Sequence, residues 1–471
     1  MSSKKDRKIM IIGGGLAGVE AAWQLLQRGA AVDLYEMRPE QMTPAHSGGD
    51  LAELLCSNSL RSLRLENASG LLKKEMEYYH SLVMEAAYQS RVPAGFALAV
   101  DRLAFSSYIE KKLKAEAKFN LIRAEVKSIE ESIFDSYDAL IVASGPLSSD
   151  SLESSIQALL GADNLYFFDA QAPIIAADSI DYSKVFRASR YQDGSGDYLN
   201  CAFTEAEYKR FYEALIEAKT TPLRSFESLK LFAGCMPLEE IARSGYESLR
   251  FGPLKPVGLK RPDGTEAYAV LQLRQDNLSA SHYNLTGCQT RLLYGEQERV
   301  FRLIPGLEEA SFVRHGQMHR NSYINAPRNL DFAYRLRSAY PRELLFVGQL
   351  SGVEGYLESA ASGLLGAVKL AERLGLEGMT WPALKAEGAE RETMLGALSF
   401  YLTAADPDNF QPAKSAFGLC RELAGKERNK YRAKYGIKQK GRRGRRLVYA
   451  ARALEHYYPE AEVEKIMEAE L

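Results

Sequence analysis

Three glycines near the N-terminus, Gly13, Gly15 and Gly18, have the spacing G-x-G-x-x-G. In dinucleotide-binding proteins the first glycine permits a tight turn and the second lets the backbone approach a pyrophosphate. The third lets a helix pack closely on the preceding strand, and the free N–H groups at the start of that helix attract the pyrophosphate. The spacing therefore predicts a dinucleotide site that includes Gly13, Gly14, Gly15, Leu16, Ala17 and Gly18.

Glu36 ends a second apolar run, about twenty residues after the glycines, where a carboxylate typically binds the ribose of a dinucleotide. Glycines also occur in ordinary turns, so the spacing alone is a weak signal. Here, however, a strand precedes the glycines, a helix follows them, and a second strand ends in an acid. We therefore expect Glu36 to hold a ribose, although this pattern does not distinguish FAD from NAD.

Cysteines are the second group of residues that could carry chemistry. Their number is odd and no two of them form a C-x-x-C pair, so neither a disulfide framework nor a zinc or other metal site is expected. Cys56 stands between an apolar pair and a Ser-Asn-Ser turn, which is typical of a partly exposed thiol whose pKa can be lowered. Cys201, Cys288 and Cys420 are expected to be structural thiols.

The elements that position these residues alternate between strand and helix at the start of the chain. The pattern predicts a helix over 69–90, a short strand over 97–102, a helix over 103–117, and strands over 119–129 and 138–146. This alternation is typical of a doubly wound α/β sheet.

The sequence pattern changes near residue 186. From there on, the predicted strands alternate polar and apolar residues, and no second full glycine fingerprint occurs. Near residues 344–349 a buried apolar strand returns, and a glycine turn then leads into a helix of small residues. In FAD enzymes of the glutathione-reductase type, such a late strand, turn and helix close over the flavin. The cofactor-binding residues expected in this closure are Gly348, Gln349, Gly352, Gly355 and Tyr356.

These patterns together predict an α/β protein with a doubly wound, FAD-binding Rossmann domain of the glutathione-reductase type. An inserted α/β domain with a largely antiparallel sheet would interrupt it. The expected division is 7–185 and 329–415 for the FAD-binding domain, 186–328 for the insertion, and 416–471 for a basic C-terminal extension.

Composition indicates a globular protein. The chain has 471 residues, of which 46% are hydrophobic and 26% charged, as in globular proteins. No apolar run is long enough for a membrane span and no signal-peptide pattern is present, so a cytoplasmic protein without membrane contact is expected.

Charge is distributed unevenly along the chain. Its net charge is −1, but residues 426–446 contain eleven Lys or Arg and a single acid, so the rest of the chain carries −11. A basic segment with interleaved tyrosines suits contact with a polyanion, while a solvated charge run is the alternative. Part of this segment after Gly441 is expected to be disordered when no polyanion is bound.

Twelve motifs together resemble the folate- and FAD-dependent tRNA uracil-5-methyltransferase family, TrmFO. They lie between about residues 8 and 417, and several are long and rare. The motifs are 13–18, 35–39, 43–46, 56–61, 92–95, 97–102, 249–253, 272–277, 295–297, 302–306, 318–321 and 352–356.

The resemblance implies an enzyme that forms 5-methyluridine in the T-loop of tRNA. It implies 5,10-methylenetetrahydrofolate as the carbon donor, FAD as a cofactor, and NADH or NADPH as the reductant. A sister activity on large-subunit ribosomal RNA shares this scaffold, so rRNA remains an alternative substrate. A plain NAD(P)H flavin oxidoreductase and a non-catalytic RNA-binding flavoprotein are further alternatives. No required protein partner is implied.

The resemblance also implies site residues. Cys56 and Cys235 would be the functional thiols, and Arg38 would join the cofactor site. Cys235 is favoured as the nucleophile that adds at uracil C6, with Cys56 beside the flavin, although the opposite assignment remains open. Candidate binders of folate or uracil, each of which could equally be an ordinary structural residue, are His46, Arg274, Gln275, Asn277, His315, His319, Arg320 and Asn321.

Overall fold

The computed structural model describes residues 7–43, 45–130, 132–161, 165–192, 196–221, 236–259, 261, 263–381 and 389–471. Cys235 lies outside these ranges. The side chains of His319 and Arg320 are not described either, although their backbone is.

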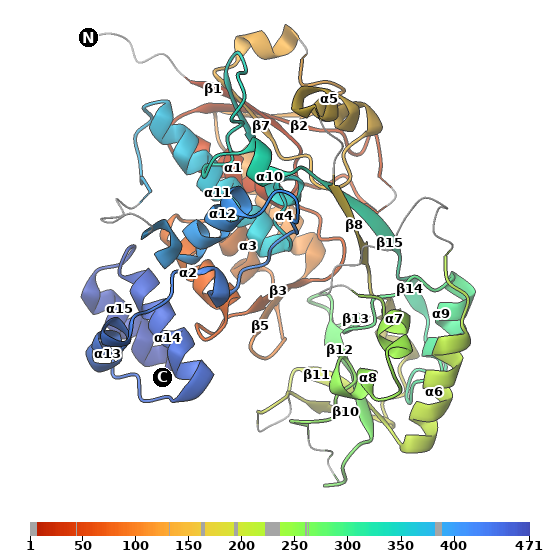
Figure 1. Ribbon diagram of the computed structural model, residues 1–471. Helices are drawn as coiled ribbons and strands as arrows, with labels where there is room; N and C mark the ends of the chain where they lie inside the picture. Colours follow the sequence, from red (N-terminus) through yellow and green to blue (C-terminus); the bar gives the residue numbers. More distant parts are fainter. Residues whose placement is uncertain are drawn as a thin grey trace, which may run out of the picture.

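A five-stranded parallel sheet forms the centre of the larger part of the molecule (Figure 1). Its strand order is β16-β7-β1-β2-β6, and every neighbouring pair is parallel. The strands are β1 (Lys8–Ile12), β2 (Ala31–Glu36), β6 (Phe119–Arg123), β7 (Ala139–Val142) and β16 (Glu343–Phe346). Most of their side chains are buried, as expected for a parallel sheet with helices on its faces.

Helix α1 (Leu16–Leu26) packs directly against the late helix α11 (Tyr356–Arg373). A Cβ on Gly363 would lie 2.1 Å from the carbonyl oxygen of Ala17, so only glycine allows this approach. Helices α4 (Arg102–Lys114) and α5 (Asp150–Leu160) complete this part of the fold. Segments separated by more than 300 residues in the sequence thus meet beside the glycine turn.

A small antiparallel sheet, β3-β5-β4, carries the chain that follows Cys56. Its strands are β3 (Ser59–Ser62), β4 (Arg91–Val92) and β5 (Ala97–Val100). The single helix predicted over 69–90 is wrong, because the structure has α2 (Ala68–Tyr78) and α3 (Leu82–Gln89) instead. His80 has a positive φ of 52°, and the Ser81 side chain caps α3 by accepting from the Met84 N–H.

A six-stranded antiparallel sheet forms the second part of the molecule, at the lower right of Figure 1. Its order is β10-β11-β12-β13-β9-β14. The strands are β9 (Ile174–Ala176), β10 (Val185–Ala188), β11 (Tyr198–Phe203), β12 (Ala269–Gln275), β13 (His282–Leu285) and β14 (Phe312–Arg314). Helices α6 (Glu205–Glu217), α7 (Leu238–Arg243), α8 (Ser248–Phe251) and α9 (Tyr294–Phe301) accompany it, and it has a hydrophobic core of its own.

Strands β8 (Leu165–Ala170) and β15 (Met318–Tyr323) form an antiparallel pair that runs between the two larger sheets (Figure 1). The predicted α/β fold, with a parallel sheet followed by a largely antiparallel one, is confirmed. The domain boundaries stay predictions. Strand β9 belongs to the antiparallel sheet although it precedes residue 186.

The C-terminal part of the chain is helical. Short α10 (Ala326–Asn329) precedes α12 (Met394–Ala404), and α13 (Gly425–Lys434), α14 (Gly441–Leu454) and α15 (Glu460–Glu470) follow. Disorder after Gly441 is therefore a wrong expectation: Leu447, Val448 and Leu454 of α14 are fully buried in the main hydrophobic core. The order of this helix is not apparent from the basic run R-R-G-R-R, because the apolar residues that are buried follow only after it.

None of the helices in the described ranges is long and apolar enough to cross a membrane.

Candidate functional site

The three glycines of the fingerprint meet different surroundings. Gly13 has a φ of 104°, and a Cβ there would lie 2.5 Å from the Ala143 carbonyl oxygen. A Cβ on Gly18 would lie 1.9 Å from the Gly13 carbonyl oxygen, whereas one on Gly15 would meet no atom within 4 Å. Gly13 and Gly18 therefore permit the turn and the close packing of helix on strand, while Gly15 borders open space at the N-terminus of α1.

Glu36 is buried at the end of β2 and is bonded to the glycine turn. One carboxylate oxygen accepts from the Gly14 N–H at 2.9 Å, and the other accepts from the Arg38 N–H and Nε, each at 3.0 Å. Burial alone would raise the pKa of this carboxyl, but the hydrogen bonds and charge of Arg38 and the Gly14 N–H hold it below its usual range. Glu36 is thus a fixed anion, able to accept further hydrogen bonds.

Arg38 is 2% exposed and links two acids of the same pocket. Besides Glu36, it donates to Glu53 Oε2 at 2.8 Å and to the carbonyl oxygens of Gly48 and Asp50 at 3.2 and 3.1 Å. The loop that follows β2 is therefore held against the glycine turn by one guanidinium.

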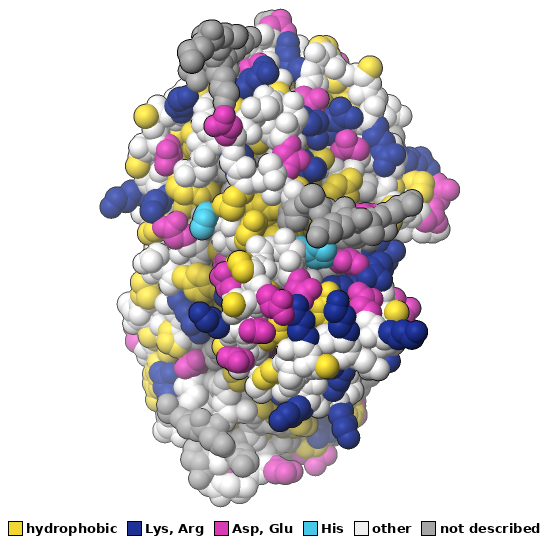
Figure 2. All heavy atoms as spheres, turned by 90° about the vertical axis from the view of Figure 1, so that its left-hand side faces the viewer, with side chains coloured by type: hydrophobic (Ala, Val, Ile, Leu, Met, Phe, Trp, Pro, Cys, Tyr) yellow, Lys and Arg dark blue, Asp and Glu magenta, His cyan; other side chains and the backbone are white. Residues whose placement is uncertain are grey.

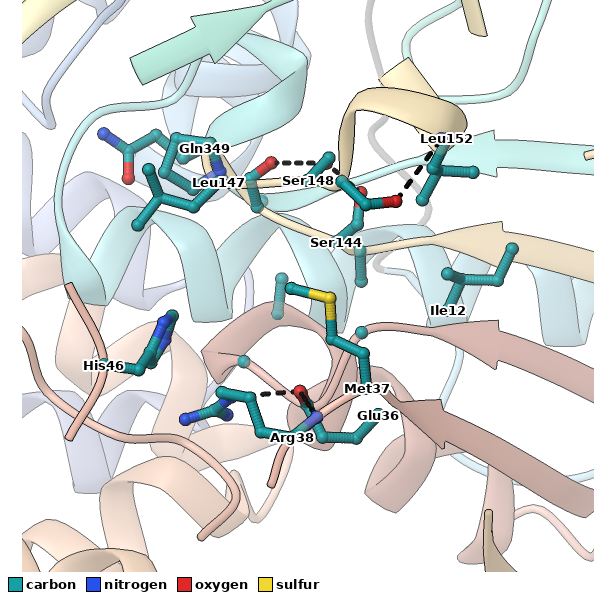
Figure 3. Close-up of a pocket in the computed structure, with 18 of the residues that line it drawn as sticks. Ile12, Glu36, Met37, Arg38, His46, Ser144, Leu147, Ser148, Leu152 and Gln349 are labelled. Atoms are coloured by element: carbon teal, nitrogen blue, oxygen red, sulfur yellow. Dashed lines mark hydrogen bonds and ion pairs between the residues drawn. The ribbon is translucent and has the colours of Figure 1, made fainter. Parts of the chain in front are cut away.

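A pocket opens at the carboxyl ends of β1, β2 and β7, the edge where open α/β sheets bind ligands. In Figure 3, Glu36, Met37 and Arg38 lie on one side of it, Leu147, Ser148 and Gln349 lie on the opposite side, and His46 lies at one end. The chain from Ala143 to Ser149 forms much of the second side, with a hydrogen bond of 2.7 Å between the hydroxyls of Ser144 and Ser148.

The pocket fits a dinucleotide such as FAD. No side chain covers the backbone at Gly15, and the N-terminus of α1, which has no acidic residue in its first turn, borders the pocket. The carboxylate of Glu36 is fixed at the end of β2. Most of the residues predicted for the cofactor line it: Gly13, Gly15, Leu16, Ala17, Glu36, Arg38, Gly348, Gln349 and Tyr356.

The other four predicted cofactor residues do not line this pocket and have packing roles. Gly14 and Gly18 allow close packing on the side of the turn that faces away from the pocket. A Cβ on Gly14 would lie 2.4 Å from the Leu51 side chain. A Cβ on Gly352 would lie 2.5 Å from the Phe410 ring, and one on Gly355 would lie 2.5 Å from Glu358 Oε2. Both have positive φ values, 90° and 113°, which glycine tolerates best.

Cys56 lies next to this pocket and is partly exposed. The hydroxyl of Tyr356, which also lines the pocket, accepts from the backbone N–H groups of Cys56 and Ser57 at 2.5 and 3.2 Å. The Cys56 carbonyl oxygen accepts from Arg314 Nη2 at 3.5 Å. The helix that closes the pocket therefore fixes the backbone that carries the thiol.

Three arginines gather around the Cys56 loop, at the junction of the two main parts of the molecule: Arg274 is buried, and Arg102 and Arg314 are half-buried. Arg102 pairs with Asp276, with Nε 3.1 Å from Oδ2, and also donates to the Leu54 carbonyl oxygen. Arg274 donates to Asn58 Oδ1 at 2.8 Å and to Ser57 Oγ at 2.7 Å. Arg314 Nε is buried and has no hydrogen-bond partner among the residues that the structure describes. We call Arg102, Arg274, Arg314 and Asp276 the junction cluster.

In the junction cluster the three arginines repel one another, and Asp276 is the carboxylate that acts on all three of them among the described residues. Burial lowers the pKa of Arg274 and of Arg314, and in both cases the charge of Arg102 lowers it further. For Arg102, burial acts in the same direction, but Asp276 together with Tyr356 and Cys56 outweighs it, and the pKa is raised. The charges of Arg102 and Arg314 also act on Cys56. An anion near Cys56 is therefore favoured.

The predicted substrate binders are distributed unevenly. His46 lines the pocket, with Nδ1 2.6 Å from Thr43 Oγ1, and Arg274 lies in the junction cluster. Asn277 donates to Ser281 Oγ and contacts His282 Nδ1, so it supports a turn. Asn321 is buried in β15.

Two predicted side chains have other roles. His315 stacks between Tyr294 and Phe312, with ring centroids 4.6 and 5.2 Å away, in a packing role within the second part of the molecule. Gln275 donates to the Asn277 carbonyl oxygen, which is a local turn contact.

Sequence reasoning missed several residues of the site. Arg102, Asp276 and Arg314 were not predicted, although Arg102 and Asp276 stand inside the motifs 97–102 and 272–277, and their charges directly after apolar runs were a signal. Glu53 and the lining residues of 143–149 were also missed. The small-residue turn after β7 was the only hint of the latter.

The remaining described cysteines are buried. Burial raises the pKa of the Cys201 and Cys288 thiols well above the usual range, and that of Cys420 to about 12. Their thiolates are therefore disfavoured, in keeping with structural roles. Within the described residues, no group of three His, Cys, Asp or Glu side chains could hold a metal ion.

Comparisons with known proteins agree with this geometry. The family model described as glucose inhibited division protein A matches residues 8–377. The methylenetetrahydrofolate–tRNA-(uracil-5-)-methyltransferase TrmFO of Natranaerobius thermophilus is 52% identical over 418 residues, which is 88% of this chain and 93% of that protein. The TrmFO protein of Lactobacillus delbrueckii subsp. bulgaricus is 51% identical over 92% of this chain and 96% of its own length.

Among solved structures, GidA of Aquifex aeolicus superimposes with a TM-score of 0.66 at 15% identity, covering 100% of this chain and 77% of that chain. At this identity the likeness concerns the fold alone.

Proposed function

Because the chain belongs to the TrmFO family of folate-dependent tRNA (uracil-5-)-methyltransferases, we propose that it forms 5-methyluridine in RNA. The proposed substrate is the T-loop uridine of tRNA. The observation that carries the proposal is the contact between a dinucleotide pocket and the Cys56 loop, made through Tyr356. A cytoplasmic reaction without a required protein partner accords with this proposal.

FAD is the cofactor that the pocket would hold, with the N-terminus of α1 at its pyrophosphate and Glu36 at a ribose. When bound and reduced by NADH or NADPH, it supplies a hydride, while 5,10-methylenetetrahydrofolate supplies the carbon. Arg38 keeps Glu36 ionised and in place. His46 borders the pocket and could contact the folate.

The chain itself must activate the uracil ring, because C5 is a poor nucleophile until a group adds at C6. A thiolate that adds at C6 gives C5 enolate character, and a hydrogen-bond donor near O4 stabilises the developing negative charge. Cys235 is proposed as this nucleophile, although it lies outside the described residues.

Cys56 is proposed to act beside the cofactor pocket. Its surroundings support a reactive thiol: it is partly exposed, its backbone is fixed by Tyr356, and the charges of Arg102 and Arg314 act on it. Arg274 and Arg314 could also bind an anionic part of folate or stabilise charge on uracil. The opposite assignment of the two thiols predicts the opposite pattern of defects below.

Nucleoside analysis tests the proposal directly. The FAD-loaded protein is incubated with methylenetetrahydrofolate, NADH or NADPH, and either unmodified tRNA or unmodified ribosomal RNA. We expect 5-methyluridine in tRNA. Product only in ribosomal RNA would show that ribosomal RNA is the substrate. No product in either RNA would favour a flavin oxidoreductase over a methyltransferase.

Cysteine variants then separate the two thiols. Cys235→Ala should abolish product while the protein keeps FAD and its oxidation of NAD(P)H. Cys56→Ala should also impair product formation but still form a covalent adduct between Cys235 and a 5-fluorouracil-containing RNA. Cys201→Ala, which removes a buried thiol elsewhere, serves as the control. An adduct that is lost in Cys56→Ala and kept in Cys235→Ala would reverse the assignment.

A further inference from the structure

A second concave surface lies away from the cofactor pocket, between α2, the segment 415–418 and α14. We call it the arginine groove. The residues that line it are Arg61, Asn67, Ala68, Ser69, Ser415, Ala416, Phe417, Gly418, Arg442, Arg445, Arg446 and Tyr449. We propose that the arginine groove binds the phosphodiester backbone of the RNA substrate, and this inference rests on the function proposed above.

Charge is the first support for this proposal. Among the described residues, four arginines line the groove and no acid does. Arg442 and Arg445 are exposed, and within the described residues neither forms an ion pair. By contrast, the nearby Arg443, which does not line the groove, pairs with Glu66. The groove therefore holds positive charge that the fold itself does not neutralise.

The position of these arginines on α14 is the second support. Arg442 lies in the first turn of the helix, which has no acidic residue there, and Lys440 precedes it as the N-cap without a side-chain cap. Cations are disfavoured at a helix N-terminus, and like charges three or four residues apart repel one another. An arrangement that opposes folding in this way is expected where an anion binds.

Aromatic side chains add a surface for a base. Phe417 and Tyr449 both line the groove, and their ring centroids lie 5.8 Å apart with planes inclined by 34°. Arginine charge beside aromatic rings is the combination used to bind single-stranded nucleic acid, since rings stack on bases and guanidinium groups bind phosphates. Inorganic phosphate would use the arginines alone.

The groove is joined to the catalytic region through Arg61 and Glu358. Arg61 Nη1 lies 2.8 Å from Glu358 Oε1, and the same oxygen accepts from the Ser415 N–H and hydroxyl at 2.8 and 2.6 Å. Glu358 belongs to α11, two residues after Tyr356, and Arg61 belongs to β3, which follows the Cys56 loop. RNA held in the groove would thus be positioned relative to the Cys56 loop.

A local groove differs from a uniformly basic face. On the side of the molecule that carries the C-terminal helices, Lys and Arg side chains are interspersed with Asp and Glu (Figure 2). General attraction of RNA by such a mixed surface is weak and depends little on which cation is removed. Binding in the groove should instead depend on Arg442 and Arg445 in particular.

The test compares two double variants of the full-length, FAD-loaded protein. Arg442→Ala/Arg445→Ala removes two groove cations, and Arg428→Ala/Lys430→Ala removes two exposed cations of α13 that do not line the groove. Affinity for unmodified tRNA is measured by fluorescence anisotropy at several salt concentrations. The groove variant should bind roughly tenfold more weakly, with a salt slope smaller by about 1.4, while the control changes less than about twofold.

Three outcomes would overturn the proposal: unchanged affinity of the groove variant, equal losses in both variants, or tight binding of inorganic phosphate without any effect of the variant on RNA. Recovery of most of the affinity by Arg442→Lys/Arg445→Lys would support charge recognition. Because binding and 5-methyluridine are measured separately, a wild-type protein that makes no product but binds RNA through the groove would refute only the proposed function.

Discussion

Two groups of arginines in this molecule differ in what neutralises them. In the junction cluster, the half-buried Arg102 is paired with the buried Asp276, and Arg274 donates to Ser57 and Asn58. In the arginine groove, Arg442 and Arg445 are exposed, and none of the described lining residues is an acid. The same residue type thus serves to hold two parts of the fold together in one place and remains open to a ligand in the other.

The contrast follows from the cost of burying charge. A guanidinium taken out of water must have an anion or hydrogen-bond acceptors from the protein, so its partners are fixed within the fold. An exposed guanidinium has no such need and can exchange water for an incoming phosphate. Removing the partner should therefore be harmful at the junction, and removing the arginine should be nearly harmless to folding in the groove.

Asp276→Ala should cause the largest effect on stability. It would leave the half-buried Arg102 without its carboxylate, next to two other cations, and the loss of one partner of a buried pair costs at most about 3–5 kcal/mol. The free energy of unfolding is measured by urea titration of the FAD-loaded protein. Asp263→Ala, at an exposed pair with Arg261, is the matched control and should change stability by less than about 1 kcal/mol.

A second variant distinguishes the cost of leaving Arg102 unpaired from the cost of removing side-chain atoms of Asp276. Asp276→Leu/Arg102→Met replaces the pair with apolar side chains and should recover much of the stability lost in Asp276→Ala. If Asp276→Ala unfolds like the wild type, the buried pair does not hold the junction together.

The sequence predicted the cofactor side of this molecule better than the junction. The glycine spacing and Glu36 are local signals, because a short strand-turn-helix fixes both the backbone geometry and the partners. Gly14 and Glu36 accordingly meet in a hydrogen bond of 2.9 Å. The pairing of Arg102 with Asp276 joins residues 174 positions apart, and no periodicity in either segment indicates it.

The C-terminal extension was predicted only in part from the sequence. Its charge was visible in the sequence, but its order was not, because α14 is stabilised by burial of Leu447, Val448 and Leu454 against distant elements. The break between α2 and α3 was missed for a related reason: His80 adopts a left-handed conformation that residue preferences do not favour. Tertiary packing decides both cases.

Lys73 is a buried cation that forms no ion pair within the described part of the chain. It lies in α2 behind the arginine groove and donates to the carbonyl oxygens of Ser62 and Ser69 at 3.0 and 3.3 Å. Burial lowers its pKa from 10.5 to about 7, with Glu358 and Glu77 opposing the shift and Arg61 adding to it. Between these values the unfolded chain binds a proton that the folded chain has lost, so stability should rise with pH.

The effect of Lys73 should reach at most about 1.4 kcal/mol per pH unit, between pH 7 and pH 10. It is measured as the difference in unfolding free energy between the wild type and Lys73→Met across that range, which cancels the titration of other groups. Lys74→Met, at the next position of α2, should keep the wild-type dependence. A pH dependence that survives in Lys73→Met would show that another group causes it.

The smallest expected effect has the opposite sign. Arg442→Ala/Arg445→Ala should stabilise α14 by roughly 0.3–1 kcal/mol, because it removes a cation from the first turn and relieves repulsion among neighbouring arginines. Slower hydrogen exchange of the α14 amides would report this gain, and adding salt should reduce it. Faster exchange would mean that these side chains already have partners within the fold, as at the junction. A gain in helix stability together with a loss of RNA affinity would place the missing counter-charge on the ligand, because only a partner absent from the folded chain makes the same arginine unfavourable alone and favourable when bound.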